Sequence, residues 1–172
     1  MMTSSGRIVE RQAPCGLNHL VLNVRDLEES HRFWTELLGF RHVGAVRPSA
    51  DGSLRVRMRF YSGDHDGKLH HHDVALVECP DLPAASAGRP QAINHVAIGF
   101  PTEAAWSSRL AFLRGRGVPL YGRIDRGVTK SIHLTDPNGY EIELVYELPR
   151  ALWEDDIEAA LNVRIELPVD AG

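Results

Sequence analysis

An internal repeat is the feature that most restricts the fold of this chain. Residues 17–22 read Leu-Asn-His-Leu-Val-Leu, and residues 93–98 read Ile-Asn-His-Val-Ala-Ile. Both copies are short runs of apolar and β-branched residues, which is typical of a strand. A helical pattern follows each copy, and several shorter strand-like segments come after it. Because repetition on this scale indicates a repeated structural unit, we expect two copies of one module.

The helix expected after each copy has recognisable ends. In the first half Asp26 is a suitable N-cap, and Gly39 follows the last apolar position of the pattern. In the second half residues 101–102 begin the helix, and Gly115 or Gly117 ends it. The similarity between the halves therefore extends from the strand through the helix.

The remaining segments complete the modules. Strand-like patterns occupy residues 40–47, 54–61 and 73–78 in the first half and residues 118–124, 130–134 and 140–146 in the second. The fold class expected is α+β, with two tandem βαβββ modules. We expect a tail at 1–14, one domain at 15–148, and a C-terminal helix and tail at 149–172. Within the domain, a module at 15–79 and a module at 92–148 are joined by a linker at 80–91 that is rich in Pro, Ala, Ser and Gly.

Composition limits the classes of function. The chain has 19 basic and 23 acidic residues, a net charge of −4, which argues against nucleic-acid binding. It has no apolar run of the roughly 18 residues that a membrane helix needs and no signal-peptide pattern, so we expect a cytoplasmic protein. Cys15 and Cys79 are too few for a disulfide framework and are expected as thiols buried in strands. The mixed pattern at 151–162 predicts a surface or subunit-contact helix, and hence a possible homo-oligomer.

Histidine is the compositional outlier, with nine residues, three of them consecutive at 70–72. His19 and His95 occupy the same position in the two copies, so a pseudo-two-fold relation between the halves would bring them together. A single histidine on a strand is more often a hydrogen-bonded structural residue. Repetition at the equivalent position favours metal ligation instead.

A carboxylate is expected as the third metal ligand. Glu143 lies between apolar residues of the last strand, where burying an acid is costly unless it is paired or bound to a metal. The alternative is the solvent face of an edge strand, which would suit Glu141 equally well. Two histidines and one carboxylate are typical of non-haem Fe(II) oxygenases.

Together, the repeat, the two histidines and the segment Asp-Pro-Asn-Gly-Tyr-Glu-Ile-Glu-Leu at 136–144 resemble the vicinal oxygen chelate superfamily, over about residues 15–147. That superfamily includes glyoxalase I, bleomycin-resistance proteins and extradiol catechol dioxygenases. Residues 72–76, His-Asp-Val-Ala-Leu, are similar to the segment that carries the second-sphere catalytic histidine of the single-domain type I extradiol branch. The resemblance implies sheets curled as half-barrels around a metal cleft.

The roles that this resemblance implies are iron ligation by His19, His95 and Glu143 and acid/base catalysis by His72. It implies a non-haem Fe(II)-dependent extradiol dioxygenase of aromatic catabolism, an oxidoreductase that inserts both atoms of O2 into a catechol-type diol. Aligning the two halves places Ala75 opposite Glu143, where isomerase relatives commonly carry a fourth ligand. An open position there favours a substrate that chelates the metal itself.

Two departures from the extradiol pattern concern the substrate. His133 stands where that branch usually has a tyrosine. A second cleft histidine that the branch often has near the start of residues 125–132 is absent here, with Ile124 and Arg126 in that neighbourhood. We expect His133 to contact substrate and to share in catalysis. Lys130 and Arg126 are further substrate-binding candidates. Arg55, Arg57 and Arg59 alternate along one strand and are expected on a solvated face, unless one of them clamps a substrate carboxylate.

Two other classes of function stay open. One is another metal-dependent enzyme of the same superfamily, an isomerase, epimerase or lyase that uses Mn(II), Zn(II) or Ni(II). The other is a metal-free small-molecule binding protein of the antibiotic-resistance kind. Within the histidine run, His70 and His71 are expected at the loop rim or in an exposed metal-scavenging tract. No role is assigned to His31, His42 and His65.

Overall fold

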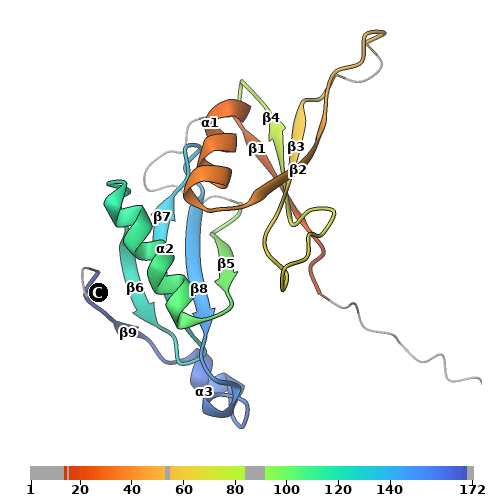
Figure 1. Ribbon diagram of the computed structural model, residues 1–172. Helices are drawn as coiled ribbons and strands as arrows, with labels where there is room; N and C mark the ends of the chain where they lie inside the picture. The colour runs from red at the N-terminus through yellow and green to blue at the C-terminus, as the bar shows by residue number, and fades with distance from the viewer. Residues whose placement is uncertain (1–13, 15, 53–54, 84–91, 170–172) are drawn as a thin grey trace, which may run out of the picture.

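The computed structural model describes residue 14 and residues 16–52, 55–83 and 92–169 (Figure 1). Cys15, most of the expected N-terminal tail and most of the expected linker lie outside these residues. No helix in the described part of the chain is long and apolar enough to cross a membrane.

The first module folds around a four-stranded sheet in the order β1-β4-β3-β2. Its elements are β1 (Leu20–Val24), α1 (Leu27–Arg32), the π-helical turn η1 (Phe33–Leu37), β2 (Arg41–Val46), β3 (Met58–Ser62) and β4 (Val74–Glu78). Strand β1 runs parallel to β4, and the other neighbours are antiparallel. The carboxylate of Asp26 accepts hydrogen bonds from the backbone N–H groups of Glu28 and Glu29, so it caps α1 as expected.

The second module repeats this order in a five-stranded sheet, β5-β8-β7-β6-β9. Its elements are β5 (Val96–Phe100), α2 (Glu103–Gly115), β6 (Tyr121–Asp125), β7 (Thr129–Thr135) and β8 (Glu141–Glu147), followed by η2 (Arg150–Leu152), α3 (Ile157–Leu161) and β9 (Ile165–Glu166). Strand β5 runs parallel to β8, as β1 does to β4. The α+β class and the two βαβββ modules are confirmed, and the sheets remain open rather than closed into a barrel.

The C-terminal segment differs from the single helix expected at 151–162. A 3₁₀ turn at Arg150–Leu152 and the short helix α3 replace it. The carboxylate of Asp156 accepts a hydrogen bond from the backbone N–H of Ala159, which starts α3 afresh at that point. Strand β9 then pairs with β6 at the edge of the second sheet.

Cys79 is not a buried strand residue as expected. It directly follows β4 and is half-buried. Its thiol donates a hydrogen bond to the side-chain oxygen of Asn23, 3.4 Å away.

One hydrophobic core joins the two modules. The indole rings of Trp34 and Trp106 are fully buried in it, together with apolar residues of both sheets. Helix α2 covers one face of the second sheet, and the Trp106 indole N–H donates to the backbone carbonyl of Leu144, 2.9 Å away (Figure 1). Leu144 therefore faces this core, and Glu143, the preceding residue of β8, lies on the opposite face of the sheet.

The turn between β7 and β8 ties the second module to the first. The side-chain oxygen of Asn138 accepts from the backbone N–H of Arg25 at 2.8 Å, and its amide nitrogen donates to the hydroxyl of Ser30 at 3.0 Å. The Arg25 guanidinium also donates to the carbonyl of Pro137. Asn138 and Ser30 are buried, so these hydrogen bonds satisfy polar groups inside the core and hold the turn against the first module.

Candidate functional site

The repeated Asn-His pairs adopt the same local structure in both modules. His19 lies one residue before β1 and His95 one residue before β5. Nδ1 of His19 is 2.7 Å from Oδ1 of Asn18, and Nδ1 of His95 is 2.8 Å from Oδ1 of Asn94. Because an amide oxygen only accepts, each Nδ1 carries the proton and each Nε2 keeps its lone pair. A histidine oriented in this way is suited to binding a metal through Nε2.

Glu143 lies between two imidazoles on β8. Its Oε2 is 3.2 Å from Nε2 of His95, and its Oε1 is 3.6 Å from Nε2 of His133. Nδ1 of His133 donates to the carbonyl of Gly122, so the lone pair on Nε2 points toward the carboxylate. Glu143 is only 8% exposed. We name His95, His133 and Glu143 the β8 donor group; it offers two imidazole nitrogens and one carboxylate, which are donor types that divalent transition metals accept.

Glu143, rather than Glu141, is the buried carboxylate of this strand. The Glu141 side chain is 39% exposed and accepts a hydrogen bond from the hydroxyl of Tyr121. Its Oε1 lies 3.9 Å from Nε2 of His133, farther than the nearest oxygen of Glu143. Of the two acids, Glu143 is therefore the one held among the imidazoles.

His72 lies beside His19 in the first module. The two ring centroids are 4.4 Å apart, and the ring of Phe60 packs 4.9 Å from His72. Burial lowers the pKa of His72, and the positive charges of His19 and His71 lower it further when those rings are protonated. A neutral imidazole in this place is able to accept a proton at neutral pH.

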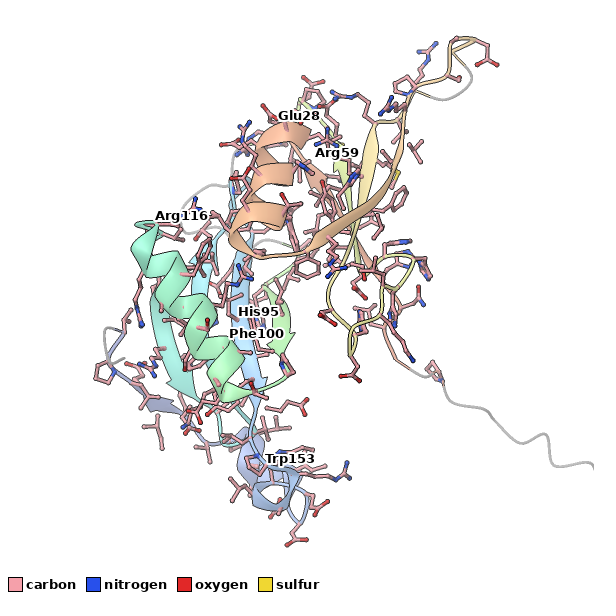
Figure 2. All side chains as sticks on the ribbon, viewed as in Figure 1. Glu28, Arg59, His95, Phe100, Arg116 and Trp153 are labelled. Atoms are coloured by element: carbon pink, nitrogen blue, oxygen red, sulfur yellow. The ribbon has the colours of Figure 1, made fainter. Side chains whose placement is uncertain are left out.

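The predicted site residues thus fall into two groups. Within the described ranges, no hydrogen bond, ion pair or ring contact joins His19 or His72 to the β8 donor group. In the described part of the chain, three possible metal-ligating atoms lie within 4.8 Å of one another only in the β3–β4 loop. That set does not include His19. His95 lies near β5 in the second module (Figure 2).

Lys130 and Arg126 are not gathered with either group. Side chains alternate along β7, so Lys130 lies on the opposite face from His133, and its Nζ is 3.8 Å from a carboxylate oxygen of Glu103 in α2. Arg126 lies in the turn between β6 and β7, where its backbone N–H donates to the carbonyl of Thr129.

The strand registers confirm the alignment of the two halves. Val21 pairs with Ala75 in the first sheet, and Ala97 pairs with Glu143 in the second. Val21 and Ala97 each lie two residues after the repeated histidine, so Ala75 is the structural equivalent of Glu143. A methyl group offers no ligand atom, and the first module therefore contributes no carboxylate at that position.

The arginine-rich segment at 55–59 is engaged in ion pairs on the surface of the first sheet. An Nη1 atom of Arg57 lies 2.6 Å from a carboxylate oxygen of Glu78. The Arg59 guanidinium forms two hydrogen bonds with the carboxylate of Glu28 in α1 (Figure 2). Arg55 is exposed and precedes β3. Exposed pairs of this kind contribute little to stability.

His31 should make stability depend on pH. Nδ1 of His31 is 3.1 Å from the hydroxyl of Tyr61, and burial, followed by the charge of Arg59, lowers the pKa of this histidine below 6.5. Near pH 6.5 the unfolded chain therefore binds a proton at this histidine more readily than the folded chain does. As a result, the free energy of unfolding falls as the pH drops through 6.5. We expect His31→Gln to lose less unfolding free energy than wild type between about pH 7.5 and 5.5 in urea titrations. His71→Gln at an exposed position is the control, and equal losses in all three proteins would contradict the assignment.

Comparison with known proteins gives consistent matches. The family model described as the Glyoxalase/Bleomycin resistance protein/Dioxygenase superfamily matches residues 16–144. Catechol-2,3-dioxygenase of Bacillus subtilis (strain 168) is 27% identical over 147 residues, which are 83% of this chain and 45% of that protein. Biphenyl-2,3-diol 1,2-dioxygenase 3 of Rhodococcus globerulus is 29% identical over 133 residues, which are 74% of this chain and 61% of that protein. The chain thus spans about half the length of these curated relatives.

Solved structures share the fold. A glyoxylase/bleomycin resistance protein/dioxygenase domain from Frankia sp. EAN1pec has a TM-score of 0.61 at 16% identity, covering 79% of this chain and 94% of that one. The fosfomycin resistance protein FosX of Listeria monocytogenes has a TM-score of 0.57 at 17% identity, covering 79% and 96%. A mutant of the same FosX, solved with Mn(II) and a dihydroxypropylphosphonic acid, has a TM-score of 0.54 at 18% identity, covering 77% and 92%.

Proposed function

The chain belongs to the Glyoxalase/Bleomycin resistance protein/Dioxygenase superfamily, and from this premise we propose that it is an Fe(II)-dependent extradiol dioxygenase. Its substrates would be a catechol-type aromatic diol and O2, with both oxygen atoms entering the ring-opened product. The observation that carries the proposal is the pair of repeated histidines with unprotonated Nε2 atoms, one of them 3.2 Å from a buried carboxylate, together with alanine at the fourth position. The similarity to a catechol-2,3-dioxygenase and to a biphenyl-2,3-diol 1,2-dioxygenase supports it.

In this proposal His19, His95 and Glu143 hold the metal. The donors fit iron because imidazole and carboxylate together form the ligand set of non-haem Fe(II) oxygenases. When bound, the ion would supply Lewis-acid polarisation of the diol and a path for electron density to pass from the diol to O2. The hydrogen bonds from Nδ1 of His19 to Asn18 and from Nδ1 of His95 to Asn94 leave Nε2 of each imidazole without a proton, as metal ligation requires.

His72 would act as the acid/base group. Its Nδ1 lies 2.8 Å from Nδ1 of His71, so Nε2 is the atom that exchanges protons. In the proposed cycle Nε2 takes one proton from a diol hydroxyl and returns it before the ring opens. The ring of Phe60 packs against His72 and limits its rotation.

His133 is proposed to contact the substrate through Nε2. Because the carbonyl of Gly122 holds the proton on Nδ1, neutral His133 accepts a hydrogen bond from a diol hydroxyl at Nε2. Lys130 and Arg126 remain predicted substrate contacts. Lys130 would have to leave Glu103 to reach the face of the sheet on which His133 lies.

Oxygen uptake tests the proposed reaction. Protein loaded anaerobically with Fe(II) is mixed with a panel of catechols and air, and O2 consumption and the visible absorbance of a ring-opened product are recorded. We expect His72→Phe to retain its iron but to turn over at least ~100-fold more slowly, because general acid/base catalysis typically contributes that much. His42→Phe, an exposed histidine elsewhere in the module, should retain activity. Iron-loaded wild type that consumes no O2 with any catechol would overturn the proposal.

A further inference from the structure

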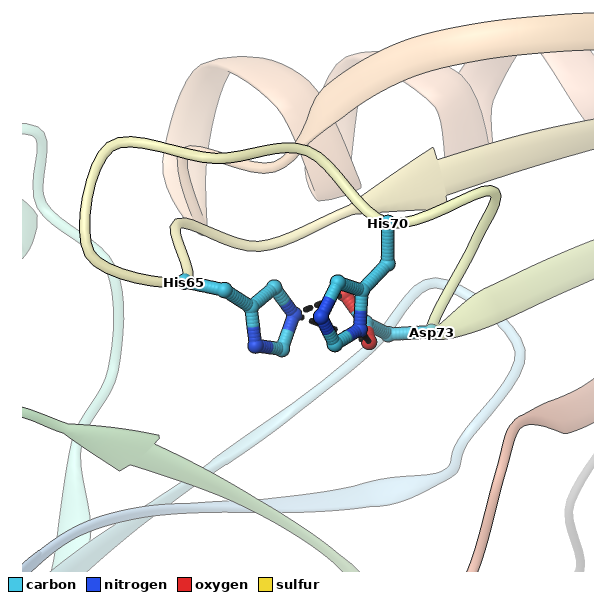
Figure 3. Close-up of side chains that lie close together, drawn as sticks. All are labelled: His65, His70 and Asp73. Atoms are coloured by element: carbon cyan, nitrogen blue, oxygen red, sulfur yellow. Dashed lines mark hydrogen bonds and ion pairs between the residues drawn. The ribbon is translucent and has the colours of Figure 1, made fainter.

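The loop between β3 and β4 gathers two further histidines and an aspartate (Figure 3). Nε2 of His65 lies 2.9 Å from Oδ2 of Asp73, and Nδ1 of His70 lies 3.6 Å from Oδ1 of the same carboxylate. One ligand atom from each residue lies within 4.8 Å of the other two. We propose that His65, His70 and Asp73 form a second metal site, which binds Zn²⁺ or a similar divalent transition ion.

The loop is held in shape by contacts that need no metal. Asp66 and Gly67 both have positive φ angles, and the backbone groups of His65 and Lys68 exchange two hydrogen bonds of 3.1 Å across this tight turn. At the other end, the carboxylate of Asp73 accepts from the backbone N–H of Gly63 at 2.7 Å. The three side chains therefore start close to their binding positions, which lowers the entropic cost of capturing an ion.

His70 is held the same way, through its backbone. Its N–H donates to the hydroxyl of Ser62, a buried residue at the end of β3. Its ring stacks on that of His65, with centroids 3.6 Å apart and planes 8° apart. Its Nδ1 lies within ion-pair distance of the Asp73 carboxylate, and in the neutral imidazole this nitrogen is available to a metal.

The donor set selects the kind of ion. Tetrahedral zinc with bonds of about 2.0–2.1 Å separates neighbouring ligand atoms by about 3.3 Å. The separations of 2.9 and 3.6 Å lie on either side of this value. On binding, the two imidazoles would turn out of their parallel stack so that both ring planes meet at the ion, and Nε2 of His65 would release to solvent the proton that it donates to Asp73. Two imidazoles favour zinc, nickel or copper, whereas Mg²⁺ and Ca²⁺ prefer oxygen ligands.

The site is accessible and shares no residue with the proposed iron ligands. The side chain of His70 is 54% exposed, so an ion reaches it from solvent. His65 and Asp73 also line a groove of about 390 Å³ whose other wall includes Ala97 and Gly99 of β5. With three protein ligands, a tetrahedral ion keeps one open position for water or an anionic ligand.

Zinc binding to the full chain tests this site. Glu143→Gln serves as the background, because it removes the carboxylate of the β8 donor group while leaving the loop unchanged. Isothermal titration with Zn²⁺ is run on this variant and on two versions of it that also carry His70→Ala or His71→Ala. Losing a ligand should weaken binding by more than the ~10–100-fold typical of an outer-shell change.

We expect Glu143→Gln and its His71→Ala version to bind one Zn²⁺ with the same affinity. The His70→Ala version should bind at least ~100-fold more weakly and lose the rise in melting temperature that Zn²⁺ gives the other two. Substituting cobalt for zinc gives a visible absorption spectrum as an independent readout. Equal zinc affinity in the His70→Ala and His71→Ala versions would overturn the site. The measurement needs no oxygenase activity, so its outcome is independent of the proposed reaction.

Discussion

Replacing Glu143 by glutamine is expected to abolish stoichiometric Fe(II) binding and to lower diol turnover by more than ~100-fold. Glutamine keeps the size of the side chain but removes its charge. The carboxylate lies against His95 and His133, and as the one acid in the proposed ligand set it is needed to offset the charge of the ion. Iron content per chain and O2 uptake with catechols measure the two effects.

Glu147→Gln is the matched control, because it makes the same change at an exposed position on the same strand. It should bind iron and turn over diols like the wild type. If Glu143→Gln retains both properties, the ligand assignment is wrong, since a spectator carboxylate would account for the result.

A mixture of two inactive variants extends the same prediction to His19. Among the described residues, β1 and β5 lie at the edges of their sheets, and Val21 on β1 is 44% exposed, which makes these edges accessible to a second copy. If that copy supplies His19, then Glu143→Gln and His19→Ala, unfolded and refolded together, should regain about a quarter of wild-type activity. Half of the dimers would be mixed, and one of their two sites would be intact. No recovery would place all ligands within one chain.

Replacing Trp106 by alanine should have the largest effect on stability, lowering the free energy of unfolding by about 3–5 kcal/mol. The indole is fully buried between α2 and the second sheet, and it donates a hydrogen bond to the carbonyl of Leu144. Removing it leaves a cavity and takes away a hydrogen bond to the backbone of the residue next to Glu143. Urea denaturation followed by circular dichroism measures the change.

Trp153→Ala is the control, because it makes the same change of residue outside the core. Its indole also donates to a backbone carbonyl, that of Leu148, but its ring is only partly buried outside the shared core. We expect a loss of less than about 1.5 kcal/mol, the net value of one hydrogen bond. Similar losses in the two variants would show that burial beneath α2 is not the source of the stability.

The module order was predictable because the repeat carries it, and the family match confirms the resemblance that the repeat suggested. Strand starts were less predictable. Both β1 and β5 begin about three residues later than the apolar patterns, because pairing starts only where β4 and β8 supply partners, at Leu20↔Val74 and Val96↔Ile142. An apolar pattern holds no information about the length of its neighbour.

The contact between His133 and Glu143 was not predicted either, because it depends on how two strands pair. His133 lies beside it because the β7–β8 hairpin pairs these two positions across the turn at 136–139. Counting outward from that Asp-Pro-Asn-Gly turn would have identified the contact. His65 and His70, by contrast, meet through the folding of one irregular loop, and no periodic pattern reports such a meeting.

In each sheet the first strand of the module pairs with the last, β1 with β4 and β5 with β8. During synthesis, therefore, β5 leaves the ribosome before β8, the strand with which it pairs. Until β8 follows, His95 has no carboxylate beside it, and the indole of Trp106 has no carbonyl to bind. The order of translation thus makes assembly of the second module and of its proposed metal ligands a single late event, whereas the strands of the first module are all made while the rest of the chain is still being synthesised.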